Sequence, residues 1–145
     1  MTAQPSILVV TGAHLAAENR DRPIAYRLKQ QIVERWGSRH EAPAELARLD
    51  AVVVCSDLWY LNREELRALP TVSVGGPEVN ALSAYLADKL PSALAIDGVL
   101  LVQADATFES PIAACWGIDA SATAQAVEAF SERYLDSFLD AALEW

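Results

Sequence analysis

The sequence contains few cysteines and histidines, and this scarcity excludes several kinds of site. It has 2 cysteines and 2 histidines in 145 residues. Cys55 and Cys115 both lie in apolar stretches typical of strands, where a buried free thiol is the usual state. We therefore expect neither a disulfide nor a metal-binding pair. Because the histidines are far apart and no carboxylate cluster has ligand spacing, we also expect no zinc site.

Basic residues and long apolar runs are also scarce. Acidic residues outnumber basic ones 20 to 11, and the formal net charge is -9. A field of this sign repels nucleic acid and anionic membranes, so we expect neither as a partner. The first apolar run, Ile7–Val10, is too short for a signal sequence or a membrane span. These features predict a cytoplasmic protein. The length of 145 residues is typical of one domain, so we expect a single α/β domain over residues 1–145.

Short apolar stretches rich in β-branched residues alternate with helical patterns, which is typical of a parallel sheet covered on both faces. The predicted strands are Ser6–Thr11, Asp50–Cys55, Thr71–Val74, Gly98–Gln103 and Pro111–Gly117. Right-handed crossovers and short connections leave few topologies, and the commonest is the flavodoxin-like order 2-1-3-4-5. We therefore predict a single-domain, doubly wound, parallel five-stranded sheet in that order, with helices on both faces.

Helical periodicity and end signals place the helices. The predicted helices are Pro23–Gly37, one or two turns in Pro43–Leu49, a short helix from Asn62 to about Leu69, Pro77–Leu90, and about Ser121–Leu143. Pro is favoured at the first helical position, and Gly just after the last, which sets several of these limits. The stretch 104–110 shows no clear period, so we expect a short or irregular connection there.

In this order the first and third strands are neighbours, and the crevice outside their carboxyl ends is the expected ligand site. His14 and Asp57 follow the first two strands, and together they could form a general base and its orienting carboxylate. No nucleophile accompanies them, because Ser56 lacks the Gly-x-Ser-x-Gly elbow and Cys55 is expected in the core. We favour an ordinary loop histidine over a catalytic one.

The turn after the third strand carries Gly75 and Gly76, followed by Pro77 and Asn80. A helix start offers free N–H groups and a positive dipole end, which suit an anion. Glu78 already places a negative charge there, so we favour a structural turn, with ligand contact at Gly75, Gly76 and Asn80 as the alternative. The loop after the first strand lacks the glycine spacing that cradles phosphates, so we expect no nucleotide cofactor.

The last predicted helix has an unusually wide apolar arc. Beyond the stripe that would face the sheet, Leu135, Leu139 and Leu143 widen the arc, and Trp145 follows. A helix that is apolar over more than half its circumference needs cover on more than one side. We therefore expect these four residues to form an interface, either in a homo-oligomer or with another protein.

The segment Val74–Asn80 reads Val-Gly-Gly-Pro-Glu-Val-Asn, and Gly117-Ile118-Asp119 later precedes the terminal helix. In these features the second half resembles the Gly-Gly-Pro-x-x-Asn domains of archaeal surface-layer proteins and, more loosely, the cell-wall-binding repeats of Gram-positive bacteria. The resemblance implies a flavodoxin-like module used for assembly or adhesion. It assigns no functional residues.

Our leading hypothesis from the sequence is a non-enzymatic α/β module that acts through protein contacts or self-assembly. The missing nucleophile and the wide apolar arc of the last helix both favour it. The alternative is a small-molecule-binding protein or hydrolase-like enzyme with its site at the carboxyl ends of strands 1 to 3. We expect no cofactor in either case.

Overall fold

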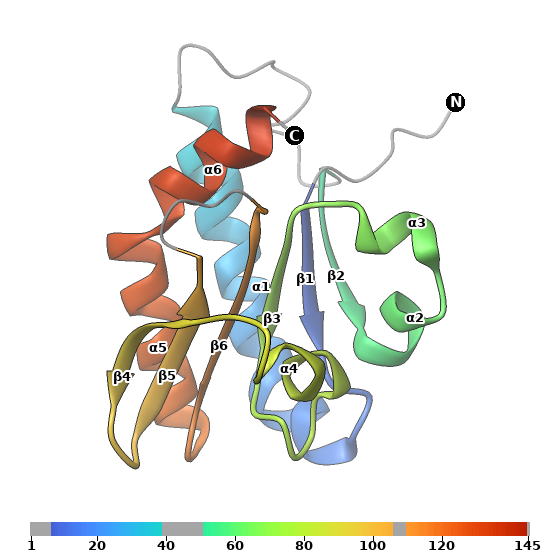
Figure 1. Ribbon diagram of the computed structural model, residues 1–145, viewed down its shortest axis with the longest axis vertical. Helices are drawn as coiled ribbons and strands as arrows, with labels where there is room; N and C mark the ends of the chain where they lie inside the picture. The colour runs from blue at the N-terminus through green and yellow to red at the C-terminus, as the bar shows by residue number, and fades with distance from the viewer. Residues whose placement is uncertain (1–6, 39–50, 106–109, 145) are drawn as a thin grey trace.

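The computed structural model describes residues 7–38, 51–105 and 110–144, and the strands in these ranges form one sheet (Figure 1). They are β1 (Ile7–Thr11), β2 (Val52–Ser56), β3 (Thr71–Val74), β4 (Ser92–Ile96), β5 (Leu100–Ala104) and β6 (Ile112–Gly117). Their order is β2-β1-β3-β6-β5-β4. The strands β2, β1, β3 and β6 are parallel, whereas β5 and β4 are antiparallel to their neighbours. The fold is therefore a mixed α/β fold.

The predicted order is right for the first three strands and wrong for the rest. The predicted strand at Gly98–Gln103 corresponds to β5, which lies outside β6 and runs antiparallel to it. An additional strand, β4, forms a hairpin with β5, and Gly98 with its φ of 73° makes the turn. A parallel neighbour needs a crossover of about a dozen residues or more, and the connections around β5 are too short for one.

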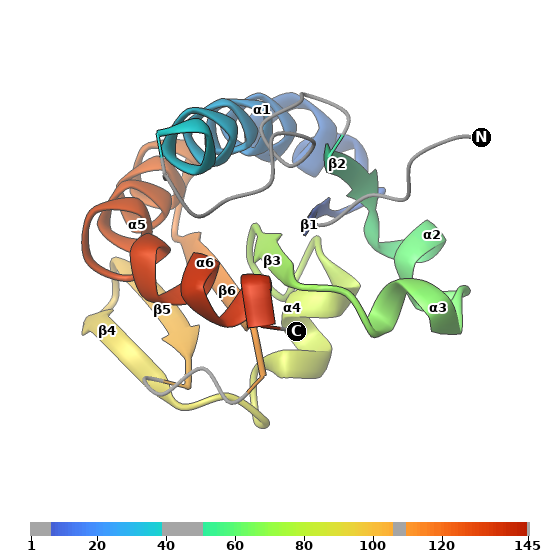
Figure 2. The ribbon, with the colours of Figure 1, turned by 90° about the horizontal axis from the view of Figure 1, so that it is seen from above.

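Helices cover both faces of the sheet. They are α1 (Leu15–Gly37), α2 (Asp57–Leu61), α3 (Glu64–Arg67), α4 (Ala81–Leu86), α5 (Ala120–Arg133) and α6 (Leu135–Glu144). Figure 2 shows α1 and α5 on one side of the sheet and α2, α3 and α4 on the other. Among the described residues, no helix is both long and apolar enough to cross a membrane.

Several helix boundaries differ from the prediction. The first helix begins at Leu15 rather than Pro23, because His14 caps it by accepting a hydrogen bond from the N–H of Ala16. The helix predicted from Pro77 begins only at Ala81. The short helix predicted from Asn62 is α3, which starts at Glu64, and α2 precedes it unpredicted. The turns predicted in Pro43–Leu49 lie outside the described residues.

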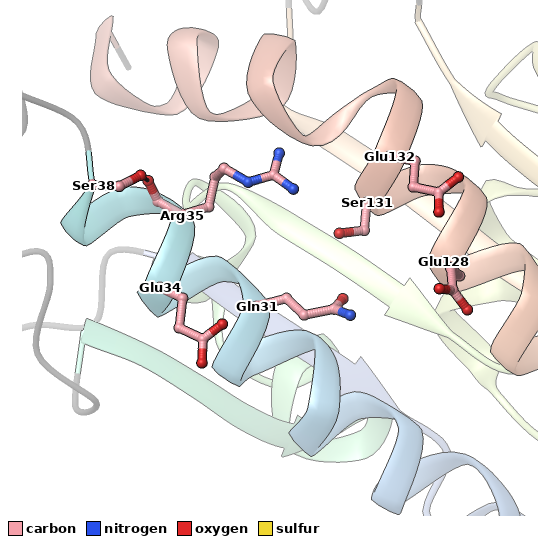
Figure 3. A pocket seen from close by; sticks show the side chains of 7 residues that line it. All are labelled: Gln31, Glu34, Arg35, Ser38, Glu128, Ser131 and Glu132. Carbon is pink, nitrogen blue, oxygen red and sulfur yellow. Dashed lines mark hydrogen bonds between the residues drawn. The ribbon is translucent and has the colours of Figure 1, made fainter.

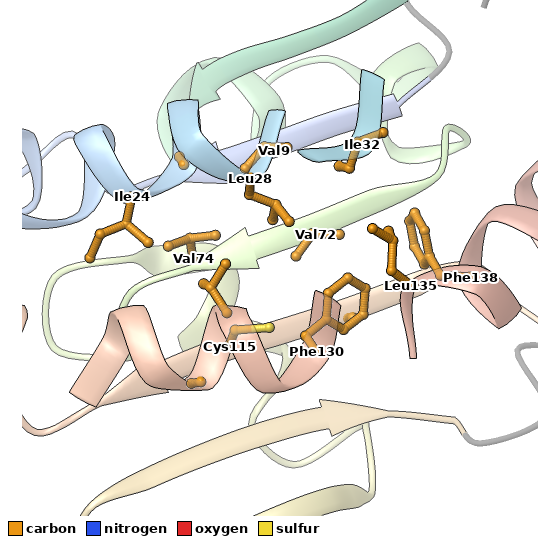
Figure 4. Close-up of a cluster of buried hydrophobic side chains, with 14 of the residues drawn as sticks. Val9, Ile24, Leu28, Ile32, Val72, Val74, Cys115, Phe130, Leu135 and Phe138 are labelled. Carbon is orange, nitrogen blue, oxygen red and sulfur yellow. The ribbon is translucent and has the colours of Figure 1, made fainter. Parts of the chain in front are cut away.

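The larger core lies between the sheet and the helices α1, α5 and α6. Val72 and Cys115 of the sheet, Leu28 of α1 and Phe130 of α5 meet there (Figure 4). The other face has a smaller cluster, which includes Tyr60. The short helices α2, α3 and α4 cover it. The unequal helix lengths thus leave one face of the sheet more thinly covered than the other.

The predicted terminal helix is broken at Tyr134 into α5 and α6, and this break changes the environment of its leucines. Leu135 and Leu139 are both 0% exposed, and Leu143 packs partly buried against the same core. This burial contradicts the prediction that Leu135 and Leu139 form an exposed interface. The break at Tyr134 lets α6 pack these two leucines into the core of the same chain. Trp145 lies outside the described residues.

Candidate functional site

The structure places the sequence-predicted site residues at one end of the sheet, where β1, β2 and β3 finish. His14 caps α1, Asp57 opens α2, and Asn80 caps α4 after the turn at Gly75 and Gly76. His14, Asp57 and Asn80 line a shallow depression of about 490 Å³. The predicted convergence of these loops is therefore present, and their hydrogen bonds decide what the residues can do.

Asp57 is a buried structural clamp. Its Oδ1 accepts hydrogen bonds from the backbone N–H groups of Ala13 (3.0 Å) and Leu58 (2.7 Å), and its Oδ2 accepts one from Ala81 (2.7 Å). His14 instead uses Nδ1 to accept the N–H of Ala16 at 3.1 Å. The carboxylate thus joins three segments of backbone, and no described hydrogen bond links it to His14. The geometry does not support a catalytic pair.

The side-chain amide of Asn80 also forms all of its hydrogen bonds with backbone groups. Its Nδ2 donates to the carbonyls of Val10 (3.2 Å) and Val74 (3.0 Å), and its Oδ1 accepts from the N–H groups of Leu82 (2.9 Å) and Ser83 (3.2 Å). A neutral amide offers two donors and one carbonyl oxygen with two lone pairs, so all are engaged. Asn80 therefore ties the ends of β1 and β3 together and caps α4, with no group left for a ligand.

Two glycines allow the loops at this end to touch. A Cβ at Gly12 would lie 1.7 Å from the carbonyl oxygen of Val79, so the loop after β1 packs directly on the turn before α4. Gly75 has a φ of 112°, and a Cβ there would lie 2.5 Å from Oδ2 of Asp21. These close contacts narrow the expected crevice between β1 and β3, and the shallow depression beside His14 is what remains open.

Asp21 of α1 is a residue that the sequence reading missed. It is 3% exposed, and its Oδ2 has no hydrogen-bond partner within the described part of the chain. The pKa of this carboxyl is raised to about 6, and burial is the largest cause. The charge of Arg20 lowers the pKa, and the charge of Glu78 raises it. The signal was present in the sequence, because Asp21 follows Ala17 and precedes Ala25 at four-residue spacing on the buried face of α1. With Asp21 and Glu78 beside it, the turn repels anions.

Candidate nucleophiles are all engaged or inert. Ser56 caps α2 by accepting the N–H of Trp59 at 3.2 Å, and Ser83 donates to the carbonyl of Gly75 at 2.6 Å. Both cysteines are buried free thiols, as predicted. Burial raises the pKa of the Cys55 thiol to about 11 and that of Cys115 still higher, so neither forms a thiolate near neutral pH.

A polar groove of about 370 Å³ lies between α1 and α5 (Figure 3). Glu34 on α1 faces it from one side, and Glu128 and Glu132 on α5 from the other. Arg35 is bound to Asp136 of α6, with Nη1 and Oδ1 3.2 Å apart. No group of three or more potential metal ligands occurs in the described ranges, so the groove shows no metal centre.

The thinly covered face has an apolar groove of about 490 Å³. Tyr60 of α2 and Leu82, Tyr85 and Leu86 of α4 contribute most of its apolar walls, while Arg67 with Glu64 of α3 stands at the polar side. It exists because α2, α3 and α4 are too short to close the face between them. Nothing in its lining points to a particular chemical reaction.

One group of exposed apolar side chains lies around the β4–β5 hairpin. Ile118 is 65% exposed, Ile96 49% and Val99 37%, and together with Leu101 and Trp116 they border a depression of about 240 Å³. We call these five residues the hairpin surface. β4 beside it is the outermost strand of the sheet. Clustered exposed apolar side chains of this kind mark contact sites more often than isolated ones do.

Comparison with known proteins adds no relationship. No protein-family model matches the sequence, and no curated protein is significantly similar to it. Functional inference therefore depends on the geometry described above.

Proposed function

We propose that this protein is a non-enzymatic α/β module that works through protein–protein contacts, and that the hairpin surface makes the contact. The observation that carries the proposal is the exposure of Ile96 and Val99 on the β4–β5 hairpin, with exposed Ile118 beside them just after β6. Sequence reasoning favoured the same kind of function but placed the surface on the terminal helix, whose leucines Leu135 and Leu139 are buried.

The polar groups at the carboxyl ends of β1, β2 and β3 also support this proposal, because they weaken the enzyme alternative. Asp57 and Asn80 are both buried and spend their hydrogen-bonding capacity on backbone groups. The hydrolase-like alternative needs Asp57 to orient His14, and no described hydrogen bond joins these two residues. The resemblance of Val74–Asn80 to assembly domains also favours contact over turnover.

The test compares the wild-type chain with the double variant V99S/I118S and with the control L15S. Leu15 is 74% exposed at the start of α1, so its replacement removes an even more accessible apolar side chain elsewhere. Light scattering measures self-association, and each chain serves as bait in an extract of its native cells. We expect self-association or capture of a defined protein to be lost only in the double variant. Identical masses and identical captured proteins for all three chains would contradict the proposal.

A thermal-shift screen separates this proposal from the small-molecule alternative. A ligand that binds the folded state raises the melting temperature in proportion to ln(1 + [L]/Kd). The depression beside His14, of about 490 Å³, is where such a ligand would lie. We expect no shift with nucleotides, sugars or carboxylates. A reproducible shift that H14A abolishes would favour the small-molecule alternative instead.

A further inference from the structure

The strand β4 is a free sheet edge with little protection. Native edges usually carry charges, proline or bulges that prevent pairing with another chain. β4 reads Ser-Ala-Leu-Ala-Ile, without charge or proline. Within residues 7–38, 51–105 and 110–144, two features protect this edge, and both lie near the start of β4: a register shift between Ser92 and Leu94, and the Tyr134 hydroxyl, which donates to the carbonyl of Ala93 at 3.1 Å. The half of β4 nearer the hairpin turn is therefore open.

The hydrogen bonds around β5 show which backbone groups of β4 face outward. The N–H of Ala104 donates to the carbonyl of Pro91, at 3.1 Å, so Ala104 directs its backbone toward β4. The backbone N–H and C=O groups of successive residues point to alternate sides of a strand. Those of Leu101, which pairs with Trp116, therefore point toward β6. Ala95 lies opposite Leu101 in the register. Its N–H and C=O accordingly point away from β5, to the free side of the sheet.

We propose that two copies of this chain pair through their β4 strands, antiparallel, about a two-fold axis at Ala95. The inference rests on the proposed function, since it names a partner for a contact that includes Ile96 of the hairpin surface. The N–H of Ala95 in each copy donates to the Ala95 carbonyl of the other. Ile96, which is 49% exposed in one chain, then lies beside Leu94 of the second copy. The two sheets become one continuous sheet with β4 strands at its centre.

The low charge of the β4 segment removes the electrostatic obstacle to a second copy as the occupant. The chain carries a net charge of -9, so most contacts between two copies are repulsive. Between Pro91 and Leu101 the single charged residue is Asp97, and antiparallel pairing places the two Asp97 side chains at opposite ends of the contact. A two-fold contact requires a surface that is complementary to itself. An antiparallel strand meets this condition, because its outward donor and acceptor at Ala95 match their own copies.

Light scattering across a concentration series tests the pairing. We expect the wild-type mass to rise toward twice the 15.7 kDa of one chain. A95P removes the outward N–H without removing a β4–β5 hydrogen bond, and A95K places two ammonium groups opposite each other; both should keep the mass of one chain. A95S, which is small and neutral, should behave as the wild type. Circular dichroism melts confirm that each variant is folded, and A95K keeps the test decisive if proline disrupts β4.

The possible outcomes separate this inference from the proposed function. A wild-type mass of one chain at every concentration overturns the β4 pairing. The proposed function still stands in that case if V99S/I118S loses a captured protein that L15S retains. A dimer that survives A95P and A95K but not I118S also overturns the pairing, because Ile118 lies on the hairpin surface and not on the β4 edge. If the wild type neither associates nor captures a protein, both proposals fail.

Discussion

Asp57 and Ala81 are joined by a hydrogen bond of 2.7 Å between a side-chain carboxylate and a backbone N–H, although they begin different helices. The same carboxylate holds the N–H of Ala13 after β1. A residue at this position of an α/β sheet is a natural candidate for ligand binding, and here it fixes the protein's own loops. Active sites of α/β proteins commonly lie at this end of the sheet. Here the Asp57 carboxylate at this end holds together the loops after β1 and before α4.

Replacement of Asp57 by alanine should destabilise the protein strongly. The change leaves the N–H groups of Ala13 and Ala81 without their charged partner at a partly buried junction, and each such loss costs about 1–3 kcal/mol. We expect a total of about 2–4 kcal/mol in the free energy of unfolding, measured by urea denaturation. H14A removes only a helix cap and should cost about 1 kcal/mol. Equal stability of D57A and the wild type would disprove the clamp.

Two substitutions at Asn80 separate its two structural roles. N80S keeps an oxygen that can cap α4 but loses the donors to the carbonyls of Val10 and Val74. N80A loses both functions. We expect N80S to lie between the wild type and N80A in urea denaturation, with N80A lower by about 3 kcal/mol, because its buried partners lose their hydrogen bonds. If N80S and N80A are equally stable, the cap contributes nothing measurable.

Asp21 should make stability depend on pH. Burial raises the pKa of its carboxyl from 3.8 to about 6, so near pH 5 the folded state holds a proton that the unfolded state has released. The free energy of unfolding therefore falls as the pH rises from about 4 to about 6, and it stays lower above that range. D21N removes this dependence and should be more stable than the wild type at pH 7 by about 2 kcal/mol, while matching it near pH 4.

Chemical denaturation from pH 4 to pH 8 measures the effect, and E78Q serves as the control. Glu78 raises the pKa of Asp21, so E78Q should bring the fall in stability to a lower pH without abolishing it. Parallel stability profiles for the wild type and D21N would show that Asp21 keeps its ordinary pKa in the folded protein.

Alanine at Gly12 and at Gly98 should have different effects for different reasons. At Gly12 the new Cβ would lie 1.7 Å from the carbonyl oxygen of Val79, so two loops must move apart. We expect a loss of about 3 kcal/mol or more. At Gly98, whose φ is 73°, the space is open, and the backbone conformation alone costs about 1 kcal/mol. Thermal melts of the two variants test this order, and a reversed order would refute the close packing at Gly12.

The local features of the fold could largely be predicted. Strands β1 and β3, the buried cysteines and the positions of His14 and Asp57 at one sheet end all follow from apolar runs and their flanking polar residues. The start of α1 could not be placed correctly, because Pro23 resembles a helix opening while His14 provides the actual cap. Pattern identifies an element more reliably than it identifies which of two possible ends the chain uses.

Taken alone, the sequence determined the class of fold, an α/β sheet with helices on both faces, because hydrophobic periodicity depends only on neighbouring residues. Only the tertiary structure decided three things. It placed β6 beside β3 and left β4 as the edge, it used Asp57 and Asn80 on backbone rather than on a ligand, and it buried Leu135 and Leu139. Each depends on contacts between segments far apart in the chain, and a one-dimensional pattern carries no record of which segments meet.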